Sequence, residues 1–381
     1  MSVQWVTKNA SQAVVVWGTS ANALSSNASA SSSTYTKADI QAACGFNSTP
    51  PTKANVLAMG MGWVDPGTFH AATLTGLSPS TTYYYRVQDS ATAAPSTSSP
   101  INSFTTAPAA GSSETFSIMY TADNGVVETD GALRPSVHNG KGVGAGAVLK
   151  GMAQKAASTN ARLFLANGDI SYSDGFLADW QAWMDSAEGL AASTPLVGLP
   201  GNHERDYAYN NSGTMVYSGD AIRDATKTPA YGGECGIPYE ALFAMPGTNH
   251  AKQWWSLDFG PVHFLQLSSE LNVSRGSEQQ LFAIDDLAAV NRTRTPFVIV
   301  SWHRLMYSGA PNTSSDYTFG NDKMYSQGWD DILYQYNVTA VFNGEVGEGL
   351  PRCDQAPAQT ACSAAAGAAS TPSRRMARAP R

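Results

Sequence analysis

The chain of 381 residues has few charged side chains, and its charges form no large block. Only 14% of the residues are Asp, Glu, Lys or Arg, and the net charge is −7. Proteins that bind nucleic acids gather Lys and Arg into basic patches, so we expect no nucleic-acid partner. Long apolar runs are also missing. A membrane-spanning helix needs about 18 apolar residues in a row, so we expect no membrane span.

Residues 1–20 lack the basic start and the cleavable apolar segment of a signal peptide. We expect that the true N-terminus is missing from this sequence. The surface is nevertheless typical of an exported protein, because it is rich in N-x-S/T sequons. They begin at Asn9, Asn27, Asn47, Asn210, Asn272, Asn291, Asn312 and Asn337. This number favours a glycoprotein that is secreted or vacuolar/lysosomal.

The cysteines show no C-x-x-C spacing. They are Cys44, Cys235, Cys353 and Cys362. Their spacing supports neither a zinc knuckle nor a disulfide framework, and the pairing of Cys44 and Cys235 stays open.

Length and composition indicate two folded domains, because a single core rarely grows past about 250–300 residues. Residues 1–107 predict an all-β sandwich, since short strands alternate with turns rich in Ser, Gly and Pro. The strand Val14 to Trp17 is followed by a Ser/Ala-rich loop through Ser33. A later strand presents on one face Tyr83, Tyr85 and Val87.

Residues 108–115 have the composition of a linker, and residues 116–344 predict an α/β domain in which helices cover buried sheets. The expected strands are short apolar runs at 116–120, 162–166, 195–199, 262–267, 297–302 and 338–342. A helix is expected over residues 277–290, with Ser277 as its N-cap and Gln280 reaching back to the cap. Its apolar side consists of Leu281, Ile284, Leu287 and Ala288. Residues 345–381 contain no aromatic residue and are predicted to be disordered.

Polar side chains gather directly after the strands of the α/β domain. They are Asp123, Asp169, Tyr172, Asn202, His203 and His303. Because ligands bind beyond the carboxyl ends of strands in open α/β sheets, we expect these side chains to lie together. Each group alone is compatible with a turn or a cap, but jointly they favour a metal site. Carboxylate, amide, phenolate and imidazole donors suit iron, manganese or zinc.

These groups resemble, in order and spacing, the motifs of the purple acid phosphatases, a branch of the metallophosphoesterases. The motifs are Asp123-x-Gly125, Gly168-Asp169-x-x-Tyr172, Gly201-Asn202-His203-Glu204 and His303. Similarity extends over roughly residues 3–344 and includes the stretches GGECGIPY and WWSLDFGPVHFLQLSSE. The pattern Leu77-x-Pro79-x-Thr81-x-Tyr83 resembles the fibronectin type III corner, in which a Tyr hydroxyl bonds to the main chain.

The resemblance implies a two-domain fold and a function. The fold would be a fibronectin III-like sandwich lacking its first strand, followed by a four-layer αββα sandwich truncated at its C-terminal end. The implied activity is that of an acid phosphatase that hydrolyses phosphate monoesters through a hydroxide bridging two metal ions. The implied partner is a phosphate ester, and a homodimer is an open alternative. Which phosphate ester is preferred stays open.

The resemblance also implies a role for each site residue. Asp123, Asp169 and Tyr172 would hold Fe(III). Asp169, Asn202 and His303 would hold a divalent ion (Zn, Mn or Fe(II)), so Asp169 would bridge the two. His203 would be the catalytic group that orients the phosphate or protonates the leaving group.

The last family motif, Gly-His-x-His, is replaced by Gly344-Glu345-Val346-Gly347. Both imidazoles are therefore missing from the sequence, and each would bind one metal. One explanation is an inactive or weakly phosphate-binding remnant. The other, which we favour, is that a retained intron is translated from this point, because the codons for Gly344-Glu345 can resemble a splice donor. A binding or adhesion protein using the β-sandwich is a further alternative.

Overall fold

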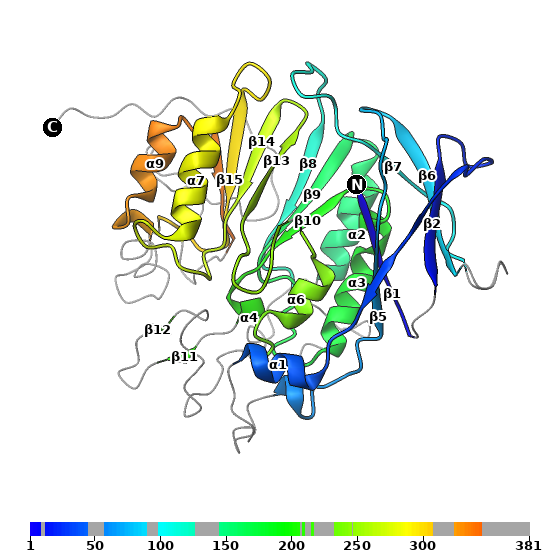
Figure 1. Cartoon of the computed structure of the whole chain (residues 1–381), viewed down its shortest axis with the longest axis horizontal. Coiled ribbons are helices and arrows are strands. Elements are labelled where there is room, and N and C mark those ends of the chain that lie inside the picture. The colour runs from blue at the N-terminus through cyan, green and yellow to red at the C-terminus, as the bar shows by residue number, and fades with distance from the viewer. Residues whose placement is uncertain are drawn as a thin grey trace.

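The computed structural model describes residues 1–8, 12–44, 57–89, 98–125, 145–205, 208–209, 215–216, 232–245, 247–307 and 324–344. These residues form a sheet-rich N-terminal domain and a second domain of helices and mixed sheets, as Figure 1 shows. Within these ranges no helix is long and apolar enough to cross a membrane. The predicted disorder of residues 345–381 concerns a part of the chain outside the described residues.

The N-terminal domain is a sandwich of two antiparallel sheets. The first sheet has the order β1-β5-β4, formed by Ser2–Thr7, Thr68–Thr73 and Ser31–Ser33. The second has the order β3-β2-β6-β7, formed by Ser26–Ser29, Ala13–Gly18, Thr82–Asp89 and Asn102–Thr105. The two inner faces enclose a core that includes Val15, Leu74, Tyr83, Tyr85 and Phe104. Tyr83, Tyr85 and Val87 lie on one face of β6, as predicted, and all three pack in this core.

The corner before β6 also forms as predicted, because the Tyr83 hydroxyl accepts a hydrogen bond from the Ser78 amide at 2.9 Å. The prediction of a loop through Ser33 was wrong, since this stretch contains the short strands β3 and β4. Their side chains are small and mostly polar, so their pairing depends on main-chain hydrogen bonds to β2 and β5, which the residue types do not signal.

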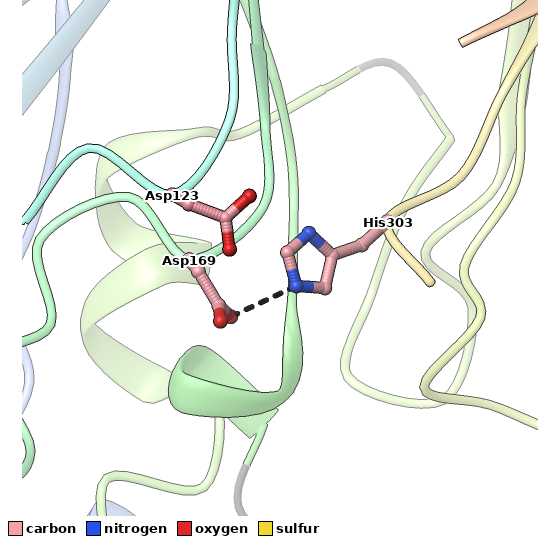
Figure 2. A group of neighbouring side chains, drawn as sticks. All are labelled: Asp123, Asp169 and His303. Atoms are coloured by element: carbon pink, nitrogen blue, oxygen red, sulfur yellow. Dashed lines mark ion pairs between the residues drawn. The ribbon is translucent and has the colours of Figure 1, made fainter. Parts of the chain in front are cut away.

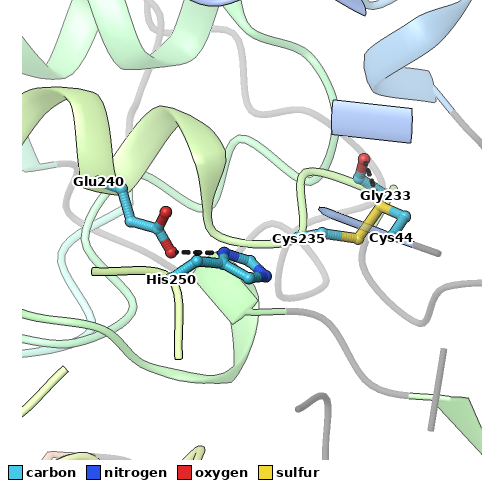
Figure 3. The surroundings of a disulfide bond; sticks show 5 residues. All are labelled: Cys44, Gly233, Cys235, Glu240 and His250. Carbon is cyan, nitrogen blue, oxygen red and sulfur yellow. Dashed lines mark hydrogen bonds and ion pairs between the residues drawn. A yellow bond between two sulfur atoms is a disulfide. The ribbon is translucent and has the colours of Figure 1, made fainter. Parts of the chain in front are cut away.

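Two elements that were not predicted join the sandwich to the second domain. Helix α1 (Lys37–Ala43) begins at the N-cap Thr36, and a 3-10 turn follows at Leu57–Met59. The buried Ile40 of α1 shares one apolar cluster with Phe164 and Trp180 of the second domain. A disulfide between Cys44 and Cys235 links the same regions, as Figure 3 shows. The domains therefore share part of one core.

The described part of the second domain contains two large sheets and one small sheet of two strands, β11 (Ala208–Tyr209) and β12 (Met215–Val216). One large sheet is parallel with the order β10-β9-β8, formed by Leu196–Leu199, Ala161–Asn167 and Ser117–Thr121. The other large sheet is mixed with the order β13-β14-β15-β16, formed by Trp255–Phe259, Val262–Gln266, Phe297–Ser301 and Ala340–Phe342. Every strand predicted in this domain is present, and β11, β12 and β13 are additional. The shorter helices are α4 (Asn202–Arg205) and α6 (Ile237–Leu242).

The two large sheets are stacked, with helices on both outer faces (Figure 1). Helices α2 (Ala145–Ala156) and α3 (Ala178–Ala191) cover the first sheet, and α7 (Glu278–Ala289) and α9 (Trp329–Gln335) cover the second. Alternation along β9 explains the layering. Leu163 and Leu165 face the other sheet, whereas Phe164 and Ala166 face the helices.

Helix α7 begins at Ser277, whose hydroxyl accepts from the Gln280 amide at 3.3 Å, as predicted. The predicted apolar side was right for Leu287, which is buried, and wrong for Leu281 and Ala288, which are exposed; the other buried residues are Gln279, Gln280 and Ala283. The Gln279 amide group bonds to the main chain of Ser268 in both directions and so turns this face inward. The Gln280 carbonyl accepts from the Gly276 amide, one residue before the predicted target.

Candidate metal centre

The imidazole of His303 is held in one orientation beyond the end of β15. Its Nδ1 atom lies 2.9 Å from the main-chain oxygen of Asn167, and the ring is fully buried. A carbonyl oxygen can only accept, so Nδ1 donates its proton and Nε2 keeps its lone pair when the ring is neutral. That Nε2 atom lies 3.3 Å from Oδ1 of Asp169. Two such atoms facing each other require a proton or a metal ion between them.

Asp123 completes a group of three with Asp169 and His303. One ligand atom from each residue lies within 4.8 Å of the other two. Figure 2 shows both carboxylates directed toward the His303 ring. Asp123 follows β8 and Asp169 follows β9, so the parallel pairing of these strands brings the two loops together. The pairing continues past the strands, because the amide of Asp123 donates to the Gly168 carbonyl at 3.1 Å.

Tyr172 lies beside this group. Its hydroxyl donates to Oδ1 of Asp123 at 3.0 Å, and its side chain is buried. Burial, together with the charges of Asp169 and Asp123, raises the pKa of Tyr172 well above its usual value. The phenol is therefore protonated in the metal-free protein and would have to lose its proton to act as a ligand.

Asn202 is the first residue of α4, directly after β10. Its Oδ1 atom is buried and receives no hydrogen bond from the part of the chain that the structure describes. Both sequence neighbours contact Asp169. The amide of His203 donates to Oδ1 of Asp169 at 3.1 Å, and a Cβ on Gly201 would come within 2.2 Å of the same oxygen. Only glycine fits at position 201.

His203 has two acidic neighbours. Its Nδ1 lies 2.7 Å from Oδ1 of Asp174, and its Nε2 lies 3.7 Å from Oδ2 of Asp169. Its ring packs on Tyr172 with a centroid distance of 4.2 Å. Burial favours the neutral ring, but Asp169 and Asp174 outweigh burial and raise the pKa of His203 to about 9. His203 is thus an imidazolium at neutral pH in the metal-free protein and can donate a proton.

The charge of Asp169 is stabilised by its surroundings. Burial opposes ionisation, but His303 and His203 outweigh it and hold the pKa of Asp169 below its usual value.

Glu204 binds the main chain of the loops that follow β9 and β10. Its carboxylate accepts from the main-chain amides of Asp169, Ile170 and Gly201, each at 2.8 Å. Burial and the charge of Asp169 raise the pKa of Glu204 to about 7, against the effect of these hydrogen bonds.

The structure therefore brings Asp123, Asp169, Tyr172, His203 and His303 together, and it places Asn202 between two residues that touch Asp169. Sequence reasoning missed Asp174, the Asn167 carbonyl and the function of Glu204. A signal existed for Asp174 and Glu204. Asp174 stands two residues after Tyr172, and Glu204 stands two residues after Asn202. No signal existed for Asn167, which acts through its main chain.

Comparison with known families identifies the family of this chain. A model of the purple acid phosphatase N-terminal domain matches residues 1–106, and a model of calcineurin-like phosphoesterases matches residues 117–345. The chain belongs to the purple acid phosphatase family.

Several relatives of this chain come from Arabidopsis thaliana. Probable inactive purple acid phosphatase 24 is 28% identical over 76% of this chain, and probable inactive purple acid phosphatase 1 is 30% identical over 70%. Purple acid phosphatase 15 is 28% identical over 74%. The chain covers 44%, 40% and 48% of these proteins, less than half of each.

A solved purple acid phosphatase from yellow lupin (Lupinus luteus) seeds has the same fold. It superposes with a TM-score of 0.72 at 24% sequence identity, over 91% of this chain and 56% of the lupin chain. The two-domain arrangement predicted from the sequence is confirmed by this likeness and by the two family models.

The residues at the site fit a metal ion by their chemistry. The His303 lone pair facing a carboxylate and the buried Asn202 oxygen without a donor among the described residues are what ligands present to a cation. Gly344, the first residue of the replaced motif, contacts His303. The amide of Gly344 donates to the His303 carbonyl at 2.7 Å, and a Cβ on Gly344 would come within 2.6 Å of the His303 ring. Glu345 and Gly347 themselves lie outside the described residues.

Proposed function

We propose that this chain carries the machinery for metal-dependent hydrolysis of phosphate monoesters at acidic pH. The observation that supports this most is the convergence of Asp123, Asp169 and His303 from three different strand ends. Two carboxylates, an imidazole and a buried amide oxygen gather here, and this donor set suits a hard or borderline cation.

Each residue has a place in this proposal. Asp123, Asp169 and Tyr172 would hold Fe(III), and Asp169, Asn202 and His303 would hold Zn, Mn or Fe(II). When bound, these ions would supply positive charge for the phosphoryl oxygens and would activate a water molecule. His203 would bind a phosphoryl oxygen or protonate the leaving oxygen, because Asp174 and Asp169 keep its ring protonated.

A second candidate is an inactive protein that binds phosphate weakly. Glu345 could bind a metal ion, but Gly347 has no side chain, so the Fe(III) site would lose one ligand. Two relatives are themselves named probable inactive purple acid phosphatases, numbers 24 and 1, and this supports the second candidate. Both candidates use the same binding residues and differ in metal content and turnover.

One experiment separates the two candidates. The metal content of the purified chain is measured together with hydrolysis of 4-nitrophenyl phosphate at mildly acidic pH. Two metal ions per chain with turnover support the enzyme, and one or none without turnover supports the inactive protein. The double variant Glu345→His/Gly347→His is the matched comparison, and it should gain metal content if the missing imidazoles limit binding.

We further propose that the protein is exported and glycosylated. The Cys44–Cys235 disulfide is typical of oxidising compartments, and the four sequon residues that the structure describes, Asn27, Asn272, Asn291 and Asn337, are exposed. Expression in a secretory host should yield a protein whose mass falls after treatment with an N-glycosidase. An unchanged mass would contradict this proposal.

A further inference from the structure

A carboxylate outside the metal centre holds the loop that follows Tyr172. Glu234 is almost fully buried. It accepts hydrogen bonds from the Ser173 hydroxyl, from the Gly175 amide at 2.8 Å and from the Trp180 indole at 2.8 Å. Ser173 and Gly175 lie in the turn that leads into α3, and Trp180 lies in the first turn of that helix. A buried carboxylate with three donors holds such a turn more firmly than neutral acceptors would.

This turn, which we call the Tyr172 loop (residues 172–177), needs such support because its backbone is unfavourable. Tyr172 and Asp174 have φ angles of 49° and 48°, in the left-handed region that residues other than Gly rarely adopt. Backbone of this kind persists where surrounding contacts determine it, and it is enriched at functional sites. The contacts of Glu234 fall on Ser173 and Gly175, on either side of Asp174.

The Tyr172 loop in turn holds His203. Asp174 contributes the carboxylate at 2.7 Å from Nδ1, and Tyr172 contributes the ring on which the imidazole packs. A shift of the loop would therefore move both contacts of His203 at once. Of the proposed metal ligands only Tyr172 lies on this loop, whereas Asp123, Asp169 and His303 lie outside it. Glu234 thus reaches His203 through two residues without touching it.

Glu234 is itself fixed by the N-terminal domain. The next residue, Cys235, forms the disulfide with Cys44 (Figure 3), and the Gly232 carbonyl accepts from the Ala58 amide at 3.1 Å. The loop contacts the same domain, because the Leu177 amide donates to the Gly62 carbonyl at 2.9 Å. A Cβ on Gly62 would come within 1.9 Å of the Gly175 carbonyl oxygen, so the two segments touch through their main chains.

We propose that Glu234 is a positioning residue that fixes the Tyr172 loop against the N-terminal domain and so aligns His203 for phosphate ester hydrolysis. This role rests on the proposed function of the metal centre. It also gives the GGECG stretch a function, because Glu234 and Cys235 act together at the boundary of the domains. The N-terminal domain is then part of the support of the site.

The first test is Glu234→Gln in the metal-loaded full chain. An amide offers one oxygen and turns an NH2 group toward a donor, so it cannot serve all three donors. We expect kcat to fall about tenfold with KM within about twofold, as for residues that orient other groups. In the Asp174→Asn background the same substitution should change kcat by less than about twofold, because both act on His203 through one path. Independent, multiplicative losses would overturn the proposal.

The second test does not depend on activity. In metal-free protein labelled in its histidine rings, the His203 signal is assigned with His203→Gln, which is practicable because the chain has 6 His residues. Glu234→Gln and Asp174→Asn should shift or broaden the His203 signal in the same way. If Glu234→Gln does not fold, Ser173→Ala removes one contact and should produce a smaller change in the same direction. An unmoved His203 signal would overturn the proposal.

Asp286→Asn is the matched control. Asp286 is a half-buried carboxylate that also serves a histidine and a serine, His263 and Ser256, but it lies on α7. This variant should lower stability and leave both kcat and the His203 signal unchanged. A chain without phosphatase activity would contradict the proposed function alone, because the His203 signal still reports on Glu234. Full activity with an unmoved signal would contradict the positioning role alone.

Discussion

The carboxylate of Glu204 accepts a hydrogen bond from the main-chain amide of Asp169 at 2.8 Å. The same carboxylate receives the Ile170 and Gly201 amides, so one side chain joins the loop after β9 to the loop after β10. The proposed ligands Asp169 and Asn202 are placed relative to each other by this contact. Their separation is therefore set by a residue outside the proposed ligand set.

Glu204→Gln should weaken metal binding without removing a ligand. An amide leaves at least one of the three main-chain amides facing an NH2 group, so we expect a 10–100-fold loss of affinity, about the range for residues that orient ligands. Titration of metal-free protein with Mn²⁺ measures the change. Gln279→Glu, on α7, is the control for a substitution at a buried polar position, and its Mn²⁺ affinity should match that of wild type. Unchanged affinity in Glu204→Gln would contradict this role.

Asp169→Asn should abolish stabilisation by metal ions. An ion that binds only the folded state at about 100 times its dissociation constant adds about 2.7 kcal/mol to the free energy of unfolding. We expect this gain with Mn²⁺ or Zn²⁺ in wild type and none in the variant, measured by thermal denaturation. Asp285→Asn removes an exposed carboxylate on α7 and should keep the full gain. An equal gain in Asp169→Asn would place the metal elsewhere.

The double variant Cys44→Ser/Cys235→Ser should be less stable by about 2–5 kcal/mol, the usual cost of removing a native disulfide. The bond closes a long loop, with a sequence separation of 191, and it joins the two domains. Urea denaturation of oxidised wild type and the variant gives the difference. Wild type in excess reductant should behave like the variant. Equal midpoints in all three samples would argue against the disulfide.

The stability contributed by His263 should depend on pH. Its Nδ1 and Nε2 atoms each lie 2.8 Å from a carboxylate, of Asp258 and Asp286 respectively. Burial lowers the pKa of His263, but the hydrogen bonds to these carboxylates outweigh burial and raise it above its usual value. The stabilisation is therefore complete below the unfolded pKa of about 6.5 and is lost as pH rises through the folded pKa.

Asp286→Asn should accordingly lower the free energy of unfolding by about 1–2 kcal/mol near pH 5.5 and by less near pH 9. Urea denaturation at the two pH values measures both losses. Ser256→Ala, which removes a neutral partner of Asp286, should show no comparable dependence on pH. Losses of the same size at both values in Asp286→Asn would contradict the proposed charge on His263.

Much of the fold was predictable because local patterns and tertiary packing agree. The runs at 162–166 and 297–302 are strands because their alternating apolar residues fill the spaces on both sides of a sheet. The Ser-rich strands β3 and β4 were missed because their residue types have little preference for strands. The buried face of α7 was misplaced because Gln279 is held inside by hydrogen bonds, whereas Leu281 is left in solvent.

The sequence by itself determined which donors follow each strand, and thereby the chemistry of the candidate site. Ligand type and order are local properties, so Asp123, Asp169 and His303 could be named without coordinates. Only the tertiary structure decided how these donors are oriented. The Asn167 carbonyl sets the tautomer of His303 across 136 residues, and Glu234 reaches Gly175 across 59. Such contacts join distant segments of main chain, and no pattern of residue types along the chain encodes them.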